Sequence, residues 1–126
     1  MTVVATFPKV AHDWLKHELD TALYRKGGVI ASGAGIVTTG MVLGKVTASG
    51  KYAPIDFAAA DGTENAAAIL INRADATSAD VETAILIGQA QIVPNQIVWP
   101  SGATTNEKDA ALVQLAALGI VSHQRF

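Results

Sequence analysis

The 126-residue chain contains no cysteine, and only 16% of its residues are charged. Without cysteine it has no disulfide, no thiolate metal ligand and no cysteine nucleophile. An ordinary soluble domain is about 25% charged, so the surface of this protein must be short of charge. Part of the shortage reflects alanine, which a surface tolerates, and part favours apolar surfaces that are buried against partners. The net charge of -2 argues against nucleic acid as a partner.

The sequence also lacks long apolar runs. No segment approaches the roughly 18 uninterrupted apolar residues that a membrane-spanning helix needs. The first residues, MTVVATFPKV, lack the basic start and the apolar stretch of a signal peptide. We therefore expect a protein that is made and kept in the cytoplasm, with no membrane partner. Its length predicts one domain around a single core.

Groups that could perform chemistry are few and poorly placed for it. The histidines lie near the chain ends, at His12, His17 and His123. The first two are spaced so that a helix would splay them apart, which disfavours a metal site. SGAGIVTTG lacks the spacing and the Lys-Ser/Thr ending of a phosphate loop. A calcium ion could be imagined among Asp61, Asp75 and Asp80, but these carboxylates lack the alternating ligand pattern of a calcium loop. We expect no enzyme, cofactor, metal or small-molecule substrate.

The stretch VLGKVTASGKYAP, residues 42–54, specifies its local geometry most clearly. Strand-forming residues flank a short turn at Ala48-Ser49-Gly50, in which Gly50 takes the positive φ that many three-residue hairpin loops need. We predict a β-hairpin. Hairpins of this kind build scaffolds and interaction surfaces more often than active sites.

Further short strand candidates alternate with turn signals after residue 28. They are residues 29–30, 36–38, 67–72, 81–88, 90–93 and a final strand at 120–121. A loop around Asp61-Gly62 and a polar connection over 73–80 separate some of them. Strands this short and evenly spaced predict a mostly antiparallel β body, barrel or sandwich-like.

The segment TTNEKDAALVQLAALG predicts a helix over residues 105–118. Thr104 and Glu107 have the spacing of a capping box, and Gly119 stands where a helix-ending glycine belongs. The predicted apolar face, packed on the sheet, consists of Leu112, Leu115, Ala116 and either Leu118 or Gly119. Together with the strands, this helix places the protein in the α+β class.

Residues 1–28 are interpreted as a peripheral N-terminal arm and residues 29–126 as the β-rich domain. The spacing of apolar residues over 10–24 favours a short amphipathic helix, although a flexible arm fits the same sequence. RKGG at 25–28 breaks this segment. Peripheral N-termini are commonly mobile until something ties them down.

IVWPSG, residues 97–102, is the other conspicuous stretch. Trp99 followed by Pro100 predicts an extended approach to the helix, with the indole packed on the sheet. The alternative is that Trp99 lines a subunit contact, where tryptophan is enriched.

Several of these pieces, in their order and spacing, resemble the head decoration proteins of tailed phages, the group that includes the lambda protein D type. They are GMVLGKVTASGKYAPID, the AAILI strand after an Asp-Gly loop, AQIV shortly before IVWP, and a short helix ending in LGIV. The likeness covers roughly residues 29–122. It implies a homotrimer on the outer surface of the expanded phage head, made in the host cytoplasm. There it binds the major capsid protein and stabilises the capsid against internal DNA pressure.

The resemblance also implies that the N-terminal arm pairs with the capsid protein by strand addition. Because this arm is longer and more helix-like than a plain extended arm, docking of an amphipathic helix is the competing picture. The candidate partner-binding residues are Trp14, Leu15, Leu19 and Leu23 on the arm, with Trp99 and Pro100 on the body. The alternative function is a phage tail or baseplate component, or a β-domain adaptor that binds another protein.

Overall fold

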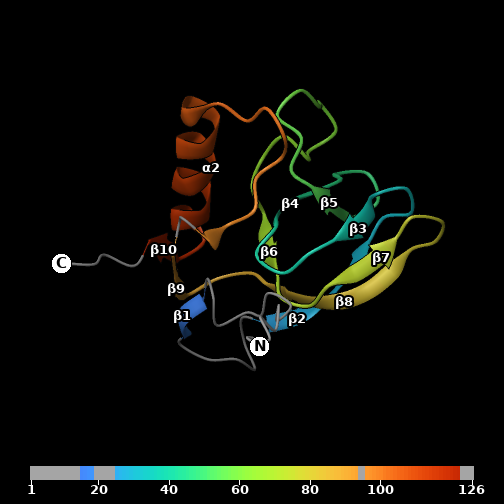
Figure 1. Cartoon of the computed structure of the whole chain (residues 1–126), viewed down its shortest axis with the longest axis horizontal. Helices are drawn as coiled ribbons and strands as arrows, with labels where there is room; N and C mark the ends of the chain where they lie inside the picture. The colour runs from blue at the N-terminus through green and yellow to red at the C-terminus, as the bar shows by residue number, and fades with distance from the viewer. Residues whose placement is uncertain (1–14, 19–24, 94–95, 123–126) are drawn as a thin grey trace, which may run out of the picture.

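The structure is a computed structural model that describes residues 15–18, 25–93 and 96–122. At its centre five strands form a closed barrel in the order β2-β5-β4-β6-β8 (Figure 1). These strands are β2 Arg25–Ile30, β4 Val42–Lys45, β5 Tyr52–Pro54, β6 Ala68–Leu70 and β8 Val81–Leu86. The described pairs within the barrel are antiparallel, except that β2 and β5 are parallel. The predicted β-rich, mostly antiparallel body is confirmed.

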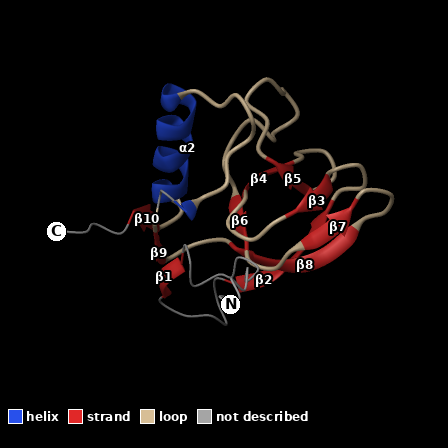
Figure 2. Ribbon diagram, viewed as in Figure 1, coloured by secondary structure: helices blue, strands red, loops and turns tan. Residues whose placement is uncertain are grey.

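Two smaller sheets and a helix complete the described fold. One sheet has the order β1-β9-β10, and β3 and β7 form a two-stranded sheet. Their bounds are β1 Leu15–Glu18, β3 Gly35–Val37, β7 Ala74–Ala76, β9 Ala90–Ile92 and β10 Ile120–Ser122. Helix α2, Thr105–Ala117, stands beside β9 and β10 at one end of the molecule (Figure 2). In the described parts of the chain, no helix is long and apolar enough to cross a bilayer.

The predicted hairpin is present, because β4 and β5 pair antiparallel. The Val46 amide donates to the Lys51 carbonyl at 2.8 Å, and the Gly50 amide donates to the Val46 carbonyl at 2.8 Å. The loop between the paired residues is therefore 47–50, one residue longer than predicted. Gly50 has a φ of 74°, the left-handed conformation that ends such a loop.

Apolar side chains pack into two clusters that share the strands β4, β6 and β8. Neighbouring residues on a strand point to opposite faces, and here both faces are buried. Leu43, Leu70 and Ile85 belong to the cluster that also contains Ile30 and Tyr52 of the barrel. The cluster that joins the barrel to α2 and the three-stranded sheet contains Val42, Ile69, Leu86, Ile92 and Leu115. Burial on both faces explains why β6 is an uninterrupted apolar run.

Both predicted ends of helix α2 are confirmed. The Glu107 amide donates to Thr104 Oγ1 at 3.1 Å, and Glu107 Oε1 accepts from the Thr104 amide at 2.9 Å. This reciprocal capping box satisfies two backbone donors at the helix start. At the other end Gly119 has a φ of 89° and its amide donates to the Ala116 carbonyl.

The buried face of α2 differs from the predicted one. Ala111 and Leu115 are fully buried, and Leu112 is half-buried against the same cluster. Ala116, which was predicted to pack inward, is exposed, and so is Leu118, one of the two alternatives predicted for the end of that face. Residues four apart lie one above the other on a helix, so Ala111 and Leu115 set the packed face and the residue after Leu115 turns toward solvent.

The N-terminal segment also differs from the prediction where it is described. Leu15–Glu18 is the strand β1, antiparallel to β9, so the helix expected over 10–24 is wrong for these residues. Pairing with β9 allows the Leu15 side chain to enter the core, where it is 6% exposed. RKGG begins the barrel strand β2. The division of the chain at residue 28 stays a prediction, although both of these segments pair with strands of the body.

Candidate functional site

The structure describes some of the predicted partner-binding residues. Outside the described residues lie Trp14, Leu19 and Leu23. Leu15 lies on β1 and its side chain is part of the protein's own core. In this conformation Leu15 therefore stabilises the fold and is not presented to a partner. Trp99 and Pro100 lie together on the segment that leads into α2.

The Trp99 segment is fixed to the barrel by its backbone. The Val98 amide donates to the Gly40 carbonyl at 2.9 Å, and the Val42 amide donates to the Val98 carbonyl at 3.4 Å. Trp99 is half-buried and packs against the core cluster that contains Leu115. The expected packing of the indole on the body is therefore confirmed, and a subunit contact stays a prediction.

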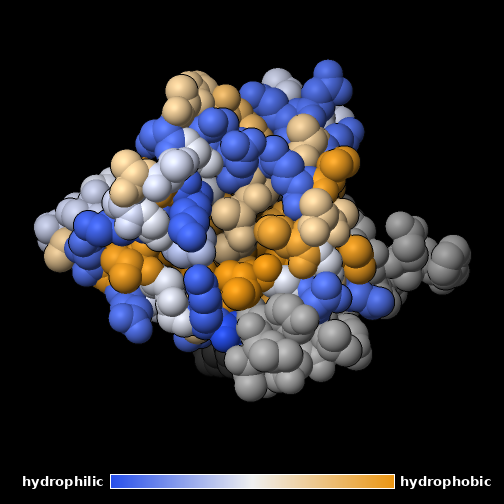
Figure 3. Space-filling view, turned by 180° about the vertical axis from the view of Figure 1, so that it is seen from behind, coloured by the Kyte–Doolittle hydropathy of each residue, from blue (hydrophilic) through white to orange (hydrophobic). Residues whose placement is uncertain are grey.

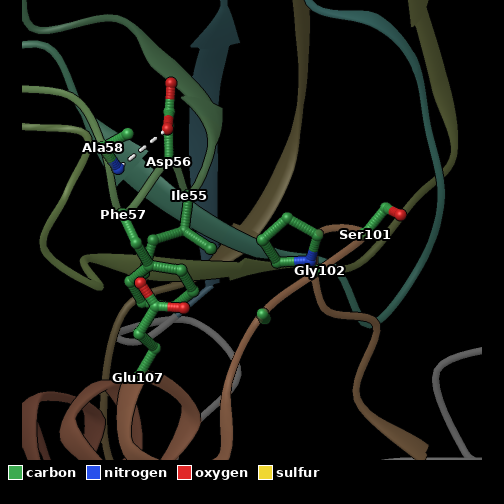
Figure 4. Close-up of a pocket in the computed structure, with 9 residues that line it drawn as sticks. Ile55, Asp56, Phe57, Ala58, Ser101, Gly102 and Glu107 are labelled. Carbon is green, nitrogen blue, oxygen red and sulfur yellow. Dashed lines mark hydrogen bonds between the residues drawn. The ribbon is translucent and has the colours of Figure 1, made fainter.

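Pro100 lines a hollow of about 250 Å³ between the segment after β5 and the start of α2. The lining residues are Ile55, Asp56, Phe57, Ala58, Pro100, Ser101, Gly102, Ala103 and Glu107. Figure 4 shows the Glu107 side chain rising from α2 toward the segment 55–58, whereas the Asp56 carboxylate points away from α2. The hollow thus combines apolar walls with one carboxylate inside and another at its rim.

The two carboxylates of the hollow keep hydrogen-bonding capacity. Glu107 Oε1 accepts from the Thr104 amide at 2.9 Å, and Asp56 Oδ1 accepts from the Ala58 amide at 3.0 Å. Among the residues that the structure describes, no lysine or arginine forms an ion pair with either carboxylate. The second oxygen of each carboxylate can therefore accept a hydrogen bond from another molecule. The two carboxylates also give the hollow negative charge.

Gln114 ties the two walls of the hollow together. Its Oε1 accepts from the Ala66 amide at 2.8 Å, and its Nε2 donates to Asn65 Oδ1 at 2.8 Å. Asn65 and Ala66 end the loop that begins at Asp56, while Gln114 lies on the same helix as Glu107. The position of the loop relative to α2 thus depends on this amide.

The loop carboxylates considered for calcium are engaged locally. A hydrogen bond from the Thr63 hydroxyl, followed by one from the Thr63 amide, lowers the pKa of Asp61. Two hydrogen bonds from Thr77 lower the pKa of Asp75 in the same way, and the bond from the hydroxyl has a larger effect than the bond from the amide. Asp80 forms an ion pair with Lys51 at 2.7 Å. In the described ranges there is no group of three acidic, histidine or cysteine side chains that could hold a metal ion.

Two lysines lie close to Tyr52, a feature that was not predicted from the sequence. Lys26 Nζ lies 6.0 Å and Lys45 Nζ 5.9 Å from the centroid of the Tyr52 ring. Tyr52 is 5% exposed, whereas both lysines are exposed. Lys26 and Lys45 come from strands distant in the sequence, so only the closed barrel brings them together.

The surface also carries apolar side chains. Figure 3 shows apolar patches, interrupted by hydrophilic residues, across the middle of the face opposite to that of Figure 1. The exposed large hydrophobic residues in the described part of the chain are Ile36, Val113, Leu118 and Val121. This surface agrees with the low charge of the sequence and favours contacts with other proteins.

The described residues form a small barrel with a packed helix, a charge-poor surface and a lined hollow, which favours a structural, protein-binding domain. The family model of bacteriophage lambda head decoration protein D matches residues 4–120. The chain therefore belongs to this family, which confirms the resemblance inferred from the sequence. No curated protein matches the chain. The family match also begins earlier than the resemblance did, and it takes in most of the N-terminal segment.

Family membership establishes the class of function. Head decoration proteins are structural proteins, so this chain is not an enzyme. The family implies binding to the phage capsid and a location in the virion capsid. The alternative of a tail, baseplate or adaptor protein gains no support from the match.

Proposed function

We propose that this protein is a cement protein, which binds the outer surface of the expanded phage capsid as homotrimers and stabilises it against internal DNA pressure. The family match over residues 4–120 carries this proposal. The partner on the shell is the major capsid protein. The protein is made in the host cytoplasm and reaches the shell by assembly.

The physical basis of the stabilisation is mass action. A protein that binds the expanded lattice, and does not bind dissociated capsid subunits, lowers the free energy of the assembled shell at each occupied site. Small increments add up over many copies. Such a protein needs rigid contact surfaces, and the barrel with its hairpin at residues 42–54 supplies them.

Capsid contact by the N-terminal arm is assigned here to the residues that precede β1. The family match includes this region from residue 4, whereas Leu15 is committed to the core. Because β1 is a strand and not a helix, strand addition to the capsid protein is favoured over docking of a helix. Trp14 immediately precedes β1 and remains a candidate for this contact. Leu19 and Leu23 follow β1 and stay candidates for a separate contact with the capsid.

Truncation separates the role of the arm from that of the body. Deleting residues 2–13 keeps β1 and Leu15, so the truncated protein should unfold at the same urea concentration as the full chain. It should, however, lose binding to expanded shells in co-sedimentation and no longer protect them from disruption by heat. Full binding and protection by a folded truncated protein would rule out this role of the arm. Deleting residues 2–24 is a poorer test, because it also removes β1.

A further inference from the structure

A threefold ring requires two different surfaces on each chain. A contact that repeats around a threefold axis is heterologous, so a patch on one copy meets a different patch on the next. The inference below rests on the homotrimer of the proposed function. A homotrimer of this chain therefore needs two unlike surfaces of the same chain that complement each other.

The first surface is the hollow. Phe57 and Ile55 give it apolar walls, and Glu107 places a carboxylate inside it. One oxygen of Glu107 is occupied by the Thr104 amide. A single free oxygen suits the compact ammonium group of a lysine better than the two-pronged guanidinium of an arginine.

The second surface is the lysine pair, Lys26 and Lys45, near Tyr52. Their ammonium groups lie 6.0 and 5.9 Å from the centroid of the Tyr52 ring, within reach of a cation–π interaction. In the described part of the chain neither lysine forms an ion pair with a carboxylate. The pair is thus an exposed basic surface without an acidic partner among the described residues.

The chemistry of the two surfaces matches. The apolar stem of a lysine can pack along Phe57, its ammonium group can lie against the aromatic face, and the free oxygen of Glu107 can accept from it. Asp56 at the rim adds a second negative charge for the other lysine.

We propose that the hollow lined by Phe57 and Glu107 of one copy receives the lysine pair, Lys26 and Lys45, of the next copy in the trimer. Each copy then gives one surface and takes the other, as a closed ring of three copies requires. The contact buries two charges of each sign at the subunit boundary and fixes the rotation of each copy relative to its neighbours.

Charge substitutions with a matched control test this contact. Ala58 is exposed and lines the hollow, whereas Ala60 is exposed on the same loop and does not line it. Ala58→Lys should raise the dissociation constant of the trimer by roughly tenfold or more, because it sets like charges face to face. Ala60→Lys should leave it unchanged. Sedimentation equilibrium measures the constant in solution; where trimers form only on expanded shells, the concentration for half-saturation of the shells is compared instead. Urea unfolding checks that each variant is folded.

Reversal of both surfaces provides the decisive comparison. Lys26→Glu with Lys45→Glu should also weaken the trimer, and adding Ala58→Lys to this variant should restore much of the association. If the wild type forms trimers and Ala58→Lys has no more effect than Ala60→Lys, the contact is wrong while the trimer stands. Loss of shell binding by Ala58→Lys with unchanged trimers would place the hollow against the capsid and also overturn the contact. A wild type that is monomeric in solution and on shells would refute the homotrimer itself.

Discussion

Replacing Gln114 with methionine should lower the free energy of unfolding by about 2 kcal/mol. The Gln114 side-chain oxygen accepts from the backbone amide of the buried Ala66, and its amino group donates to Asn65 on the same loop. Methionine keeps the length of the side chain and a high helix propensity, so the change removes mainly the hydrogen bonds. A buried donor left without an acceptor costs about 1–3 kcal/mol, and the more exposed bond to Asn65 adds little.

A graded series makes this prediction sharper. Gln114→Glu retains an acceptor for the Ala66 amide but cannot donate to Asn65 Oδ1. It should therefore cost only about 0.5–1 kcal/mol, the worth of one ordinary hydrogen bond. The neighbouring Val113 is 70% exposed, and Val113→Met should stay within about 0.5 kcal/mol of the wild type.

Urea unfolding followed by circular dichroism gives the three free energies, provided that the slope of the transition is unchanged. Hydrogen exchange at the Ala66 amide supplies a local measurement, and exchange should accelerate in Gln114→Met more than in Gln114→Glu. Equal stability of Gln114→Met and Val113→Met would show that the amide does not hold the loop to α2. The account of how the hollow is positioned would then fail.

Four further predictions concern stability. Thr104→Ala removes the helix cap and should lower the free energy of unfolding in urea by about 1 kcal/mol. An unchanged urea midpoint would show that Thr104 does not stabilise the helix. Leu15→Ala should cost about 3 kcal/mol, because its side chain lies in the core, whereas a cost near zero would mean that β1 does not pack on the body. A Cβ at Gly44 would lie 2.5 Å from the backbone of the loop that follows β5, so Gly44→Ala should cost roughly 3 kcal/mol by the same measurement. A hydrogen bond from Lys51 lowers the pKa of Asp80 below its ordinary value of 3.8. The small contribution of this ion pair to stability is complete above pH 3.8 and is lost as pH falls through the pKa of Asp80 in the folded protein. An Asp80 pKa of 3.8 or higher in an NMR titration would contradict the ion pair.

Local signals in the sequence predicted local structure well. The capping box of Thr104 and Glu107 and the glycine at position 119 act within a few residues, so their spacing was sufficient to place α2. The alternation of short strands and turns likewise indicated a barrel or sandwich-like β body, and the structure is a barrel. The family could be inferred from the order of these pieces.

Features that depend on distant pairing could not be predicted in this way. The segment 10–24 has a helical spacing of apolar residues, and the pairing of β1 with β9 overrides that local preference at Leu15–Glu18. The strand β7 lies in a segment that was predicted as a polar connection. Its sequence, Ala-Asp-Ala, contains no apolar run, and only the pairing with β3 makes it a strand. The walls of the hollow come from residues 55–58 and 100–107, which only the folded chain brings together.

Co-sedimentation with shells of the accompanying capsid protein tests the central claim most directly. The purified protein is added at increasing concentration to expanded and to unexpanded shells, and bound copies are counted per capsid subunit. The cement function predicts saturable binding to expanded shells only, close to one copy per capsid subunit, as expected for trimers at threefold positions. Binding to neither kind of shell, or equal binding to both, would contradict it.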